Sequence, residues 1–287
     1  MPELPEVASI AAQLNEKLTG KAIASGYLVS FSALKTVAIP LEALAGLEID
    51  RVTRHGKFID IEAQNIHVIF HLARAGWVTW HDVAPTVPPR PGRSGLAFRL
   101  VLDDGSGFSL TEAGTQKHLA IYVVDSPSEV PGIAALGPNP LADDFTVDDL
   151  AEILRAAGRA QVKGVLRDQR RLAGIGNAYS DEILHAAKLS PYAPCTSLDA
   201  HAVERLHATI RQVLGHAVDA AAQVPMAQLK DAKRSAMRVH GRAGRACEVC
   251  GDTIAEVSFS DSSFQYCPGC QTGGKKLADR RMSKLLK

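Results

Sequence analysis

The chain has 287 residues, of which 46% are hydrophobic, so it is long enough for one large domain or, as we expect, two. Its formal net charge is +1, and no apolar run reaches the length of a membrane span, which argues against a membrane protein. No basic segment followed by an apolar one stands at the N-terminus, so we expect no secretory signal and a cytoplasmic, bacterial protein.

The charges are divided unevenly along the chain. Residues 226–287 hold 12 Lys or Arg and 6 Asp or Glu, which leaves 20 basic and 25 acidic residues before them. This asymmetry is typical of a chain that binds a polyanion on one side. A solvated basic tail would give the same counts.

The chain begins Met-Pro-Glu-Leu-Pro-Glu-Val. If Met1 is removed, the new N-terminus is the secondary amine of Pro2, with the carboxylate of Glu3 beside it. A terminal amine has an unperturbed pKa of about 8, so part of it is neutral at physiological pH and can attack sugar or carbonyl carbons to form Schiff bases. A neighbouring acid can move the protons. The alternative is that the prolines only shape a helix entry, where proline is common.

Apolar residues at helical spacing predict a first helix over 5–18, ended by Gly20. Short strand-like segments follow, and the polar, glycine-containing segment 103–107 predicts a hairpin turn. The predicted strands are 47–54, 57–63, 67–72, 77–81, 96–102, 107–111 and 119–124. Many short strands predict an antiparallel β-sandwich packed with the leading helix, and two prolines near residue 130 place the end of this domain there. We therefore expect an N-terminal domain at 1–130.

The second half of the chain changes to helical periodicity. Thr146 is predicted to cap a helix that reaches residue 154, with Asp149 completing a capping box. Further helices are expected over 161–168 and 177–188, and Ser197 is expected to cap a fourth. These elements predict a helical domain at 131–240, followed by a cysteine-containing finger and basic tail at 241–287.

Four of the five cysteines form two Cys-x-x-Cys pairs that are separated by sixteen residues: Cys247, Cys250, Cys267 and Cys270. Without an expected export signal, this pattern indicates zinc rather than disulfides. Four thiolates fill a tetrahedral shell and leave no position for substrate or water, so we expect one structural Zn²⁺. A redox pair or two disulfides is the alternative. Cys195 is left over and expected to be unligated.

The sequence Gly-Ile-Gly-Asn at 174–177 lies between two predicted helices. Its glycines allow a tight turn, and the N–H groups that begin the next helix, with the Asn177 side chain, would form an anion site suited to a DNA phosphate. An ordinary packing corner is the alternative. Asp181 and Glu182 are expected in the first turn of that helix, where they would suit the helix dipole.

Two further side chains are candidate functional residues, and each also has an ordinary structural explanation. Lys57 enters a strand and would bind phosphate or stabilise a developing negative charge, or else point to solvent. His71 follows an apolar strand and would be either functional or a satisfied, half-buried side chain.

The order of these motifs resembles the formamidopyrimidine-DNA glycosylase/endonuclease VIII family over nearly the whole chain. PELPEV at residue 2 and GIGNAYSDE at residue 174 are highly specific to that family, and LGPNPL at 136–141 is similar to its interdomain segment. The resemblance implies an α+β protein of two domains. The first would be an antiparallel β-sandwich with a leading helix, and the second a helix-two-turn-helix domain with a zinc-finger β-hairpin.

The resemblance also implies a base-excision repair enzyme, a bifunctional DNA glycosylase and abasic-site lyase that binds damaged or abasic DNA, and we expect a monomer. Pro2 would attack the sugar of a flipped-out nucleotide, Glu3 would move protons, and β,δ-elimination would cut the strand. Glu6 would support the N-terminal helix, and Lys57 would complete the catalytic set. Residues at positions where the family contacts DNA are His71, Arg74, Lys163 and Asn177.

Three departures from the family pattern affect the expected DNA contacts. Arg74 stands where the family often has a methionine that fills the gap left by the flipped base. The segment 112–117, EAGTQK, replaces a bulkier Asp-Pro-Arg-Arg-Phe-Gly, and Ser262 replaces an arginine of the finger. Basic residues of the tail would compensate: Lys275, Lys276, Arg280 and Arg281.

From these departures we expect weaker discrimination of the opposite base, and a preference for single-stranded or open DNA. A specialist for abasic sites or unusual adducts, with weak oxidised-purine activity, is the alternative within the enzyme class. A catalytically silent DNA-binding protein is the alternative outside it, although such a protein would not need an amine beside a carboxylate.

Overall fold

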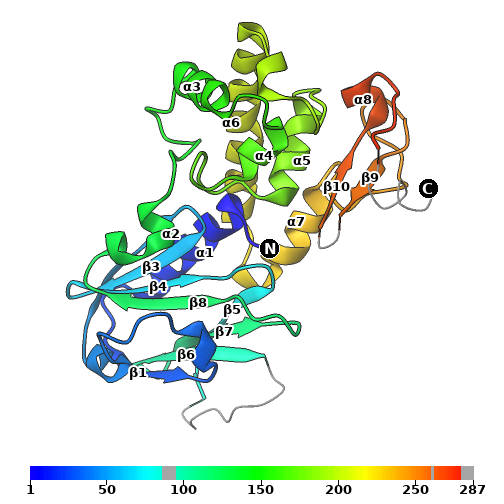
Figure 1. Ribbon diagram of the computed structural model, residues 1–287. Coiled ribbons are helices and arrows are strands. Elements are labelled where there is room, and N and C mark those ends of the chain that lie inside the picture. The colour runs from blue at the N-terminus through cyan, green and yellow to red at the C-terminus, as the bar shows by residue number, and fades with distance from the viewer. Residues whose placement is uncertain (86–94, 260–261, 279–287) are drawn as a thin grey trace. The chain divides into compact units, whose positions relative to one another are not determined.

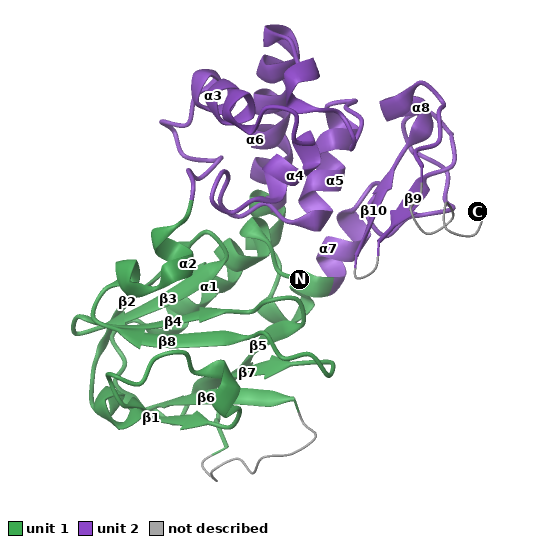
Figure 2. Ribbon diagram, in the orientation of Figure 1, with its two compact units in different colours: residues 1–136, 218–230 green, residues 137–217, 231–287 purple. Residues whose placement is uncertain are grey.

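A computed structural model describes residues 1–85, 95–259 and 262–278 (Figure 1). The chain forms two compact units, shown in Figure 2. Unit 1 comprises residues 1–136 and 218–230, and unit 2 comprises residues 137–217 and 231–287. Within the described residues, no helix combines the length and the apolar character that crossing a membrane requires. Arg280 and Arg281, the tail residues expected to compensate in DNA binding, lie outside the described residues.

Unit 1 contains helix α1 (Leu4–Leu18) and two four-stranded antiparallel sheets. One sheet has the order β1 (Ile23–Leu28), β6 (Leu96–Leu102), β7 (Gly107–Glu112) and β5 (Gly76–His81). The other has the order β2 (Ile49–His55), β3 (Phe58–Ala63), β4 (Ile66–His71) and β8 (Ala120–Val124). A single buried apolar cluster includes side chains from α1 and from both sheets. The predicted sandwich with a leading helix is therefore confirmed.

Helix α1 buries one continuous apolar stripe against this core. The buried apolar residues that form this stripe recur at helical spacing: Leu4, Val7, Ile10, Ala11, Leu14 and Leu18. The segment that returns to unit 1 also packs on this helix, where the Ser9 hydroxyl donates to the Ala221 carbonyl at 2.8 Å and Met226 N–H donates to Gln13 at 2.9 Å. These two hydrogen bonds hold the middle of α1 to the returning segment.

The connection between β6 and β7 is the predicted hairpin. Gly105 has a φ of +81°, which a glycine adopts without the steric cost of a side chain. The Asp104 carboxylate accepts from the Ser106 N–H at 2.8 Å and closes the turn. The prolines near residue 130 begin short helical elements, the 3₁₀ turn η3 (Pro127–Glu129) and α2 (Pro131–Ala134).

Unit 2 contains helices followed by a two-stranded hairpin. The helices are α3 (Val147–Ala157), α4 (Val162–Arg167), α5 (Asn177–Ala186), α6 (Ala200–Ala222, its last turn in unit 1), α7 (Leu229–Ala236, which begins in unit 1) and α8 (Pro268–Thr272). Strands β9 (Ala255–Ser258) and β10 (Ser263–Tyr266) form the antiparallel hairpin between the two cysteine pairs. A helical domain with a C-terminal cysteine finger is therefore confirmed.

Two predicted helix caps have different outcomes. Thr146 and Asp149 form the predicted capping box, in which each side chain accepts from the other residue's N–H. The prediction for Ser197 is wrong, because its hydroxyl donates to the Pro194 carbonyl instead. Asp199 lies closer to the helix and accepts from the Ala202 N–H at 2.8 Å, so it supplies the cap.

Candidate functional site

The N-terminal segment places two carboxylates at the start of α1. Pro2, Glu3 and Glu6 are all buried, whereas Met1 is 46% exposed. Glu3 caps the helix, and the Glu6 carboxylate accepts from the Glu3 N–H at 2.8 Å in a reciprocal capping box. This arrangement fixes the backbone that carries Pro2 and Glu3.

Lys57 and His71 are brought together by the pairing of β3 with β4, whose register sets Phe58 opposite His71. Lys57 is buried in the turn that precedes β3. Burial, and then the nearby positive charge of Lys57, lower the pKa of His71 from 6.5 to about 4. His71 is therefore neutral at physiological pH. Its Nδ1 accepts from the Ala73 N–H at 3.2 Å, which leaves the ring proton on Nε2 as a donor.

Arg74 is exposed on a tight turn between β4 and β5. The preceding Ala73 has a φ of +50°, and Gly76 N–H donates to the Leu72 carbonyl at 2.8 Å. A Cβ at Gly76 would lie 2.2 Å from that same carbonyl oxygen, so only glycine fits there. The backbone thus holds Arg74 at the tip of a narrow loop.

A second loop of unit 1 lies between β7 and β8. Residues 113–118 are all exposed, and they include the small residues Ala113 and Gly114. The loop is closed at its base by the buried Glu112 carboxylate, which accepts from the N–H groups of His118 at 2.8 Å and Leu119 at 3.1 Å. This role of Glu112 was not predicted, because its partners become neighbours only when the loop closes.

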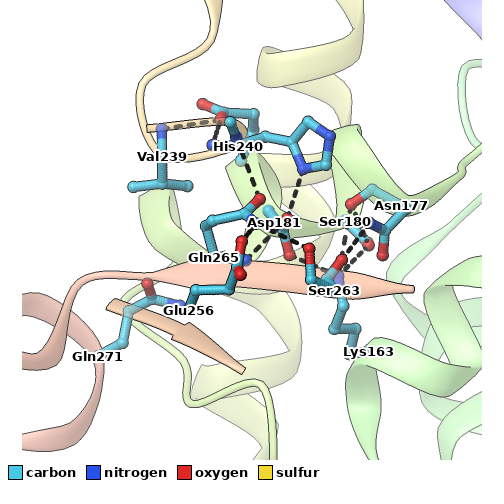
Figure 3. Close-up of polar contacts among 12 residues, drawn as sticks. Lys163, Asn177, Ser180, Asp181, Val239, His240, Glu256, Ser263, Gln265 and Gln271 are labelled. Atoms are coloured by element: carbon cyan, nitrogen blue, oxygen red, sulfur yellow. Dashed lines mark hydrogen bonds and ion pairs between the residues drawn. The ribbon is translucent and has the colours of Figure 1, made fainter. Parts of the chain in front are cut away.

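In unit 2, Lys163 is buried in a polar network on α4 and α5 (Figure 3). Its ammonium lies 2.5 Å from the Asp181 carboxylate and 2.7 Å from the Ser180 hydroxyl. The second oxygen of Asp181 lies 2.7 Å from Nδ1 of His240 and accepts from the Gln265 N–H at 3.2 Å. Asp181 therefore joins α4, the segment before the finger and strand β10.

Asn177 is the first residue of α5, and its side chain contacts the finger hairpin. Its Nδ2 donates to the Ser263 carbonyl at 2.7 Å (Figure 3). Its Oδ1 is buried and has no hydrogen-bond partner among the described residues. A phosphate offers only acceptors, so it would need the second N–H of this amide, because the Ser263 carbonyl accepts from only one of the two. A contact from Asn177 to DNA remains a prediction.

Glu182 has a structural role that was not predicted. Its carboxylate accepts from three consecutive backbone N–H groups, those of Arg238 at 2.9 Å, Val239 at 3.0 Å and His240 at 2.9 Å. Asp181 and Glu182 do not lie in the first turn of α5, so the expected dipole contact is wrong. Both side chains instead bind the chain that leads into the finger.

The four finger cysteines gather at one end of unit 2, beside α5. The Sγ atoms of Cys247 and Cys270 are 3.9 Å apart, and those of Cys250 and Cys267 are 3.3 Å apart. All four are free thiols, and so is the buried Cys195. Sulfurs on a tetrahedral zinc ion are about 3.8 Å apart, so this donor set fits a zinc ion. His185 also joins the group, which the sequence analysis did not anticipate.

Two family models match the chain. The formamidopyrimidine-DNA glycosylase N-terminal domain matches residues 1–116, and the formamidopyrimidine-DNA glycosylase H2TH domain matches residues 136–227. A formamidopyrimidine-DNA glycosylase of Symbiobacterium thermophilum is 33% identical over 98% of this chain and 93% of its own length. The chain belongs to the formamidopyrimidine-DNA glycosylase/endonuclease VIII family. It is thus a member of a family of DNA glycosylases.

A second relative and a solved structure are also similar to this chain. A formamidopyrimidine-DNA glycosylase-like protein of Mycobacterium tuberculosis is 56% identical over 153 residues, which cover 53% of this chain and 95% of that protein. The crystal structure of the Lactococcus lactis formamidopyrimidine-DNA glycosylase, bound non-covalently to DNA with an abasic site, has a TM-score of 0.81 and is 25% identical. The match covers 94% of this chain and 99% of that chain.

Proposed function

We propose that the chain is a base-excision repair enzyme of the bacterial cytoplasm, which acts as a monomer on damaged or abasic DNA. It removes the damaged base as a glycosylase and then nicks the strand as an abasic-site lyase. Membership of the family supports the reaction class. The observation that carries the assignment of the nucleophile is the buried Pro2–Glu3 pair, held at the start of α1 by the capping box.

The reaction begins after Met1 is removed, because the Pro2 nitrogen is otherwise part of a peptide bond. The free amine attacks C1′ of the flipped nucleotide, the bond from C1′ to the base breaks, and the base leaves. Glu3 protonates the sugar ring oxygen, so the ring opens and an iminium joins Pro2 to C1′. Loss of a proton from C2′ then expels the 3′ phosphate, and a second elimination expels the 5′ phosphate. Water hydrolyses the iminium and frees Pro2.

The remaining predicted residues position the DNA. Glu6 holds the Glu3 backbone, and Lys57 stabilises negative charge near the sugar. His71, in its neutral form, donates Nε2–H to a phosphate, while Arg74 reaches the gap left by the flipped base from its narrow loop. Lys163 and Asn177 are the proposed DNA contacts of unit 2.

We assign one structural Zn²⁺ to Cys247, Cys250, Cys267 and Cys270. The ion supplies a crosslink that a hairpin of two four-residue strands needs in order to fold.

Borohydride trapping on abasic DNA tests the nucleophile. The protein with a free Pro2 should become covalently linked to the strand, because borohydride reduces the iminium to a stable amine. Pro2→Gly should change the yield of this product markedly. Pro5→Ala is a matched control, since Pro5 is a nearby proline in the first turn of α1 that is not the terminal residue. If unmodified protein gives only reversible, salt-sensitive complexes, the chain is a DNA-binding protein without catalysis.

The exposed loop at residues 113–118 favours a second candidate within the same reaction class. Its small residues Ala113 and Gly114 present little surface to the base opposite a lesion, so we propose a preference for single-stranded or open DNA. Cleavage of one lesion in duplex and single-strand contexts tests this preference. A strong duplex preference with strict choice of the opposite base would contradict it.

A further inference from the structure

A histidine from the helical part of unit 2 lies against the finger cysteines. His185 stands in the last turn of α5 and is buried, and its Nε2 lies 3.4 Å from the Sγ of Cys247. The donor atoms of His185, Cys247, Cys267 and Cys270 all lie within 4.8 Å of one another. Four donor atoms at such spacing form a possible ligand set in their own right.

The spacing can be compared with that of a zinc ion bound by three thiolates and one imidazole. With Zn–S of about 2.3 Å and Zn–N of about 2.0–2.1 Å, tetrahedral angles place the nitrogen about 3.6 Å from each sulfur and the sulfurs about 3.8 Å apart. The distance from His185 to Cys247 is 3.4 Å, and that between Cys247 and Cys270 is 3.9 Å. Small movements of the other donors would complete the shell.

The two candidates for the fourth position differ in their environment. Cys250 is exposed, whereas His185, Cys247 and Cys267 are buried, and Cys270 is partly buried. The three shared cysteines therefore form the protected part of the site. Helix α5, which carries His185, is also held to the finger by Asp181 and Glu182, so the imidazole cannot easily move away from the sulfurs.

We propose that His185 is a fifth donor of the metal centre and can take the fourth coordination position in place of Cys250. When the four cysteines hold the ion, His185 does not bind it. Its Nε2–H instead donates a hydrogen bond to the Cys247 thiolate and so orients that ligand. When the Cys250 thiolate is absent, the ring proton of His185 lies on Nδ1, and the unprotonated Nε2 binds the ion directly with the three remaining thiolates. The inference rests on the proposed metal centre but not on the proposed enzymatic activity.

Cobalt(II) binding to the full-length protein tests this proposal, because Co²⁺ reports its ligands by absorption. Cys250→Ser should still bind one Co²⁺, with thiolate-to-cobalt absorption of about three quarters of the original and visible bands moved to higher energy, as expected for three sulfurs and one nitrogen. Cys250→Ser/His185→Phe should bind Co²⁺ roughly 100-fold more weakly than Cys250→Ser. His185→Phe alone should keep the spectrum of four sulfurs.

Two control variants separate this effect from general damage to the fold. Cys195→Ser removes a thiol outside the cluster and should leave the spectrum unchanged. Cys267 is fully buried and belongs both to the four-cysteine ligand set and to the set that contains His185. Cys267→Ser therefore leaves both sets incomplete and should lose stoichiometric binding even with His185 present. Circular dichroism of each variant checks that the helices remain folded.

Three results would overturn the inference in distinguishable ways. Equal Co²⁺ affinity and spectra for Cys250→Ser and the double variant would mean that water, not His185, fills the vacant position. Loss of all binding in Cys250→Ser, with intact circular dichroism, would mean that His185 cannot replace the thiolate. Absence of binding in the unmodified protein would overturn the proposed metal centre itself, together with the inference.

Discussion

The buried pair of Lys163 and Asp181 should be energetically coupled. The side chains are 5% and 0% exposed, and their charged atoms are 2.5 Å apart. Lys163→Met keeps the aliphatic part of the side chain but leaves the Asp181 carboxylate with only part of its donors, at His240 and Gln265. Asp181→Asn keeps the shape of the carboxylate but leaves the ammonium without its counter-ion.

The magnitude follows from the burial of both charges. Removal of one partner from a buried pair costs about 3–5 kcal/mol, because the other charge is left uncompensated. Lys163→Met should lie near the lower end, since the Asp181 carboxylate keeps two other contacts. Removal of both charges leaves no unpaired ion, so the double variant should lose about 2–3 kcal/mol less than the sum of the single variants.

Denaturant unfolding of the zinc-loaded protein measures these differences, with circular dichroism at the helix band as the probe. Both tryptophans of the chain, Trp77 and Trp80, lie in β5 of unit 1. Their fluorescence therefore reports the unfolding of unit 1, which contains neither substitution, and serves as the reference. The reasoning is refuted if each single variant loses less than about 1 kcal/mol, or if the double variant equals the sum.

Other expected outcomes test separate parts of the structure. Because burial lowers the pKa of His71 from 6.5 to about 4, the unfolded chain binds a proton there that the folded chain does not, so stability should be lost as the pH falls from 6.5 to 4. The free energy of unfolding, measured by denaturation at successive pH values, should fall by about 3 kcal/mol over this range. In His71→Asn the free energy of unfolding should change much less between these pH values. Gly107→Ala would place a Cβ 2.2 Å from a backbone oxygen of β6 and should lower the free energy of unfolding by about 2–3 kcal/mol. Gly215→Ala, in α6 with nothing within 4 Å of the added carbon, should raise it by about 0.5–1 kcal/mol. Glu182→Ala removes the acceptor of three N–H groups and should accelerate hydrogen exchange at residues 238–240 by roughly 100-fold, which corresponds to about 3 kcal/mol.

The strands that the sequence predicts are those with a clear alternation or a fully apolar run. Strand β1 was not predicted, because only its first residue is buried and Gly26 interrupts the apolar pattern. It forms because β6 offers an edge with which it can pair, in a register that sets Gly26 opposite Leu100. That information lies in the partner strand, about seventy residues away, and not in the segment itself.

Helix caps show the same division between local and distant information. The capping box of Thr146 and Asp149 was predictable because both partners lie within one helical turn. Ser197 and Asp199 are both capping residues by type, and the choice between them depends on where the preceding loop ends. Nothing in the sequence marks the return of residues 218–230 to unit 1, because α6 continues through the boundary without a break.

In the proposed metal centre and its surroundings, the sequence identifies the candidate ligands but not the residues that support them. The cysteine spacing predicts a metal site by itself, whereas the contacts of Asp181, Glu182 and His185 join residues that are more than fifty positions apart. Helix geometry explains why one helix can make them all, because His185 lies four positions after Asp181 and three after Glu182, so it is a surface neighbour of both. The acidic pair alone would suit an exposed helix start equally well.

Since α5 is the common support, we expect metal removal to loosen unit 2 along a defined path. Chelation frees the cysteine pairs, so the hairpin of β9 and β10 loses its crosslink, and with it Asn177 loses the fixed position of its partner Ser263. Hydrogen exchange should therefore accelerate in the strands β9 and β10 and at residues 238–240, while α1 and the sheets of unit 1 keep their protection. Exchange that accelerates equally in unit 1, or that leaves 238–240 unchanged, would mean that the acidic pair on α5 holds this segment independently of the metal.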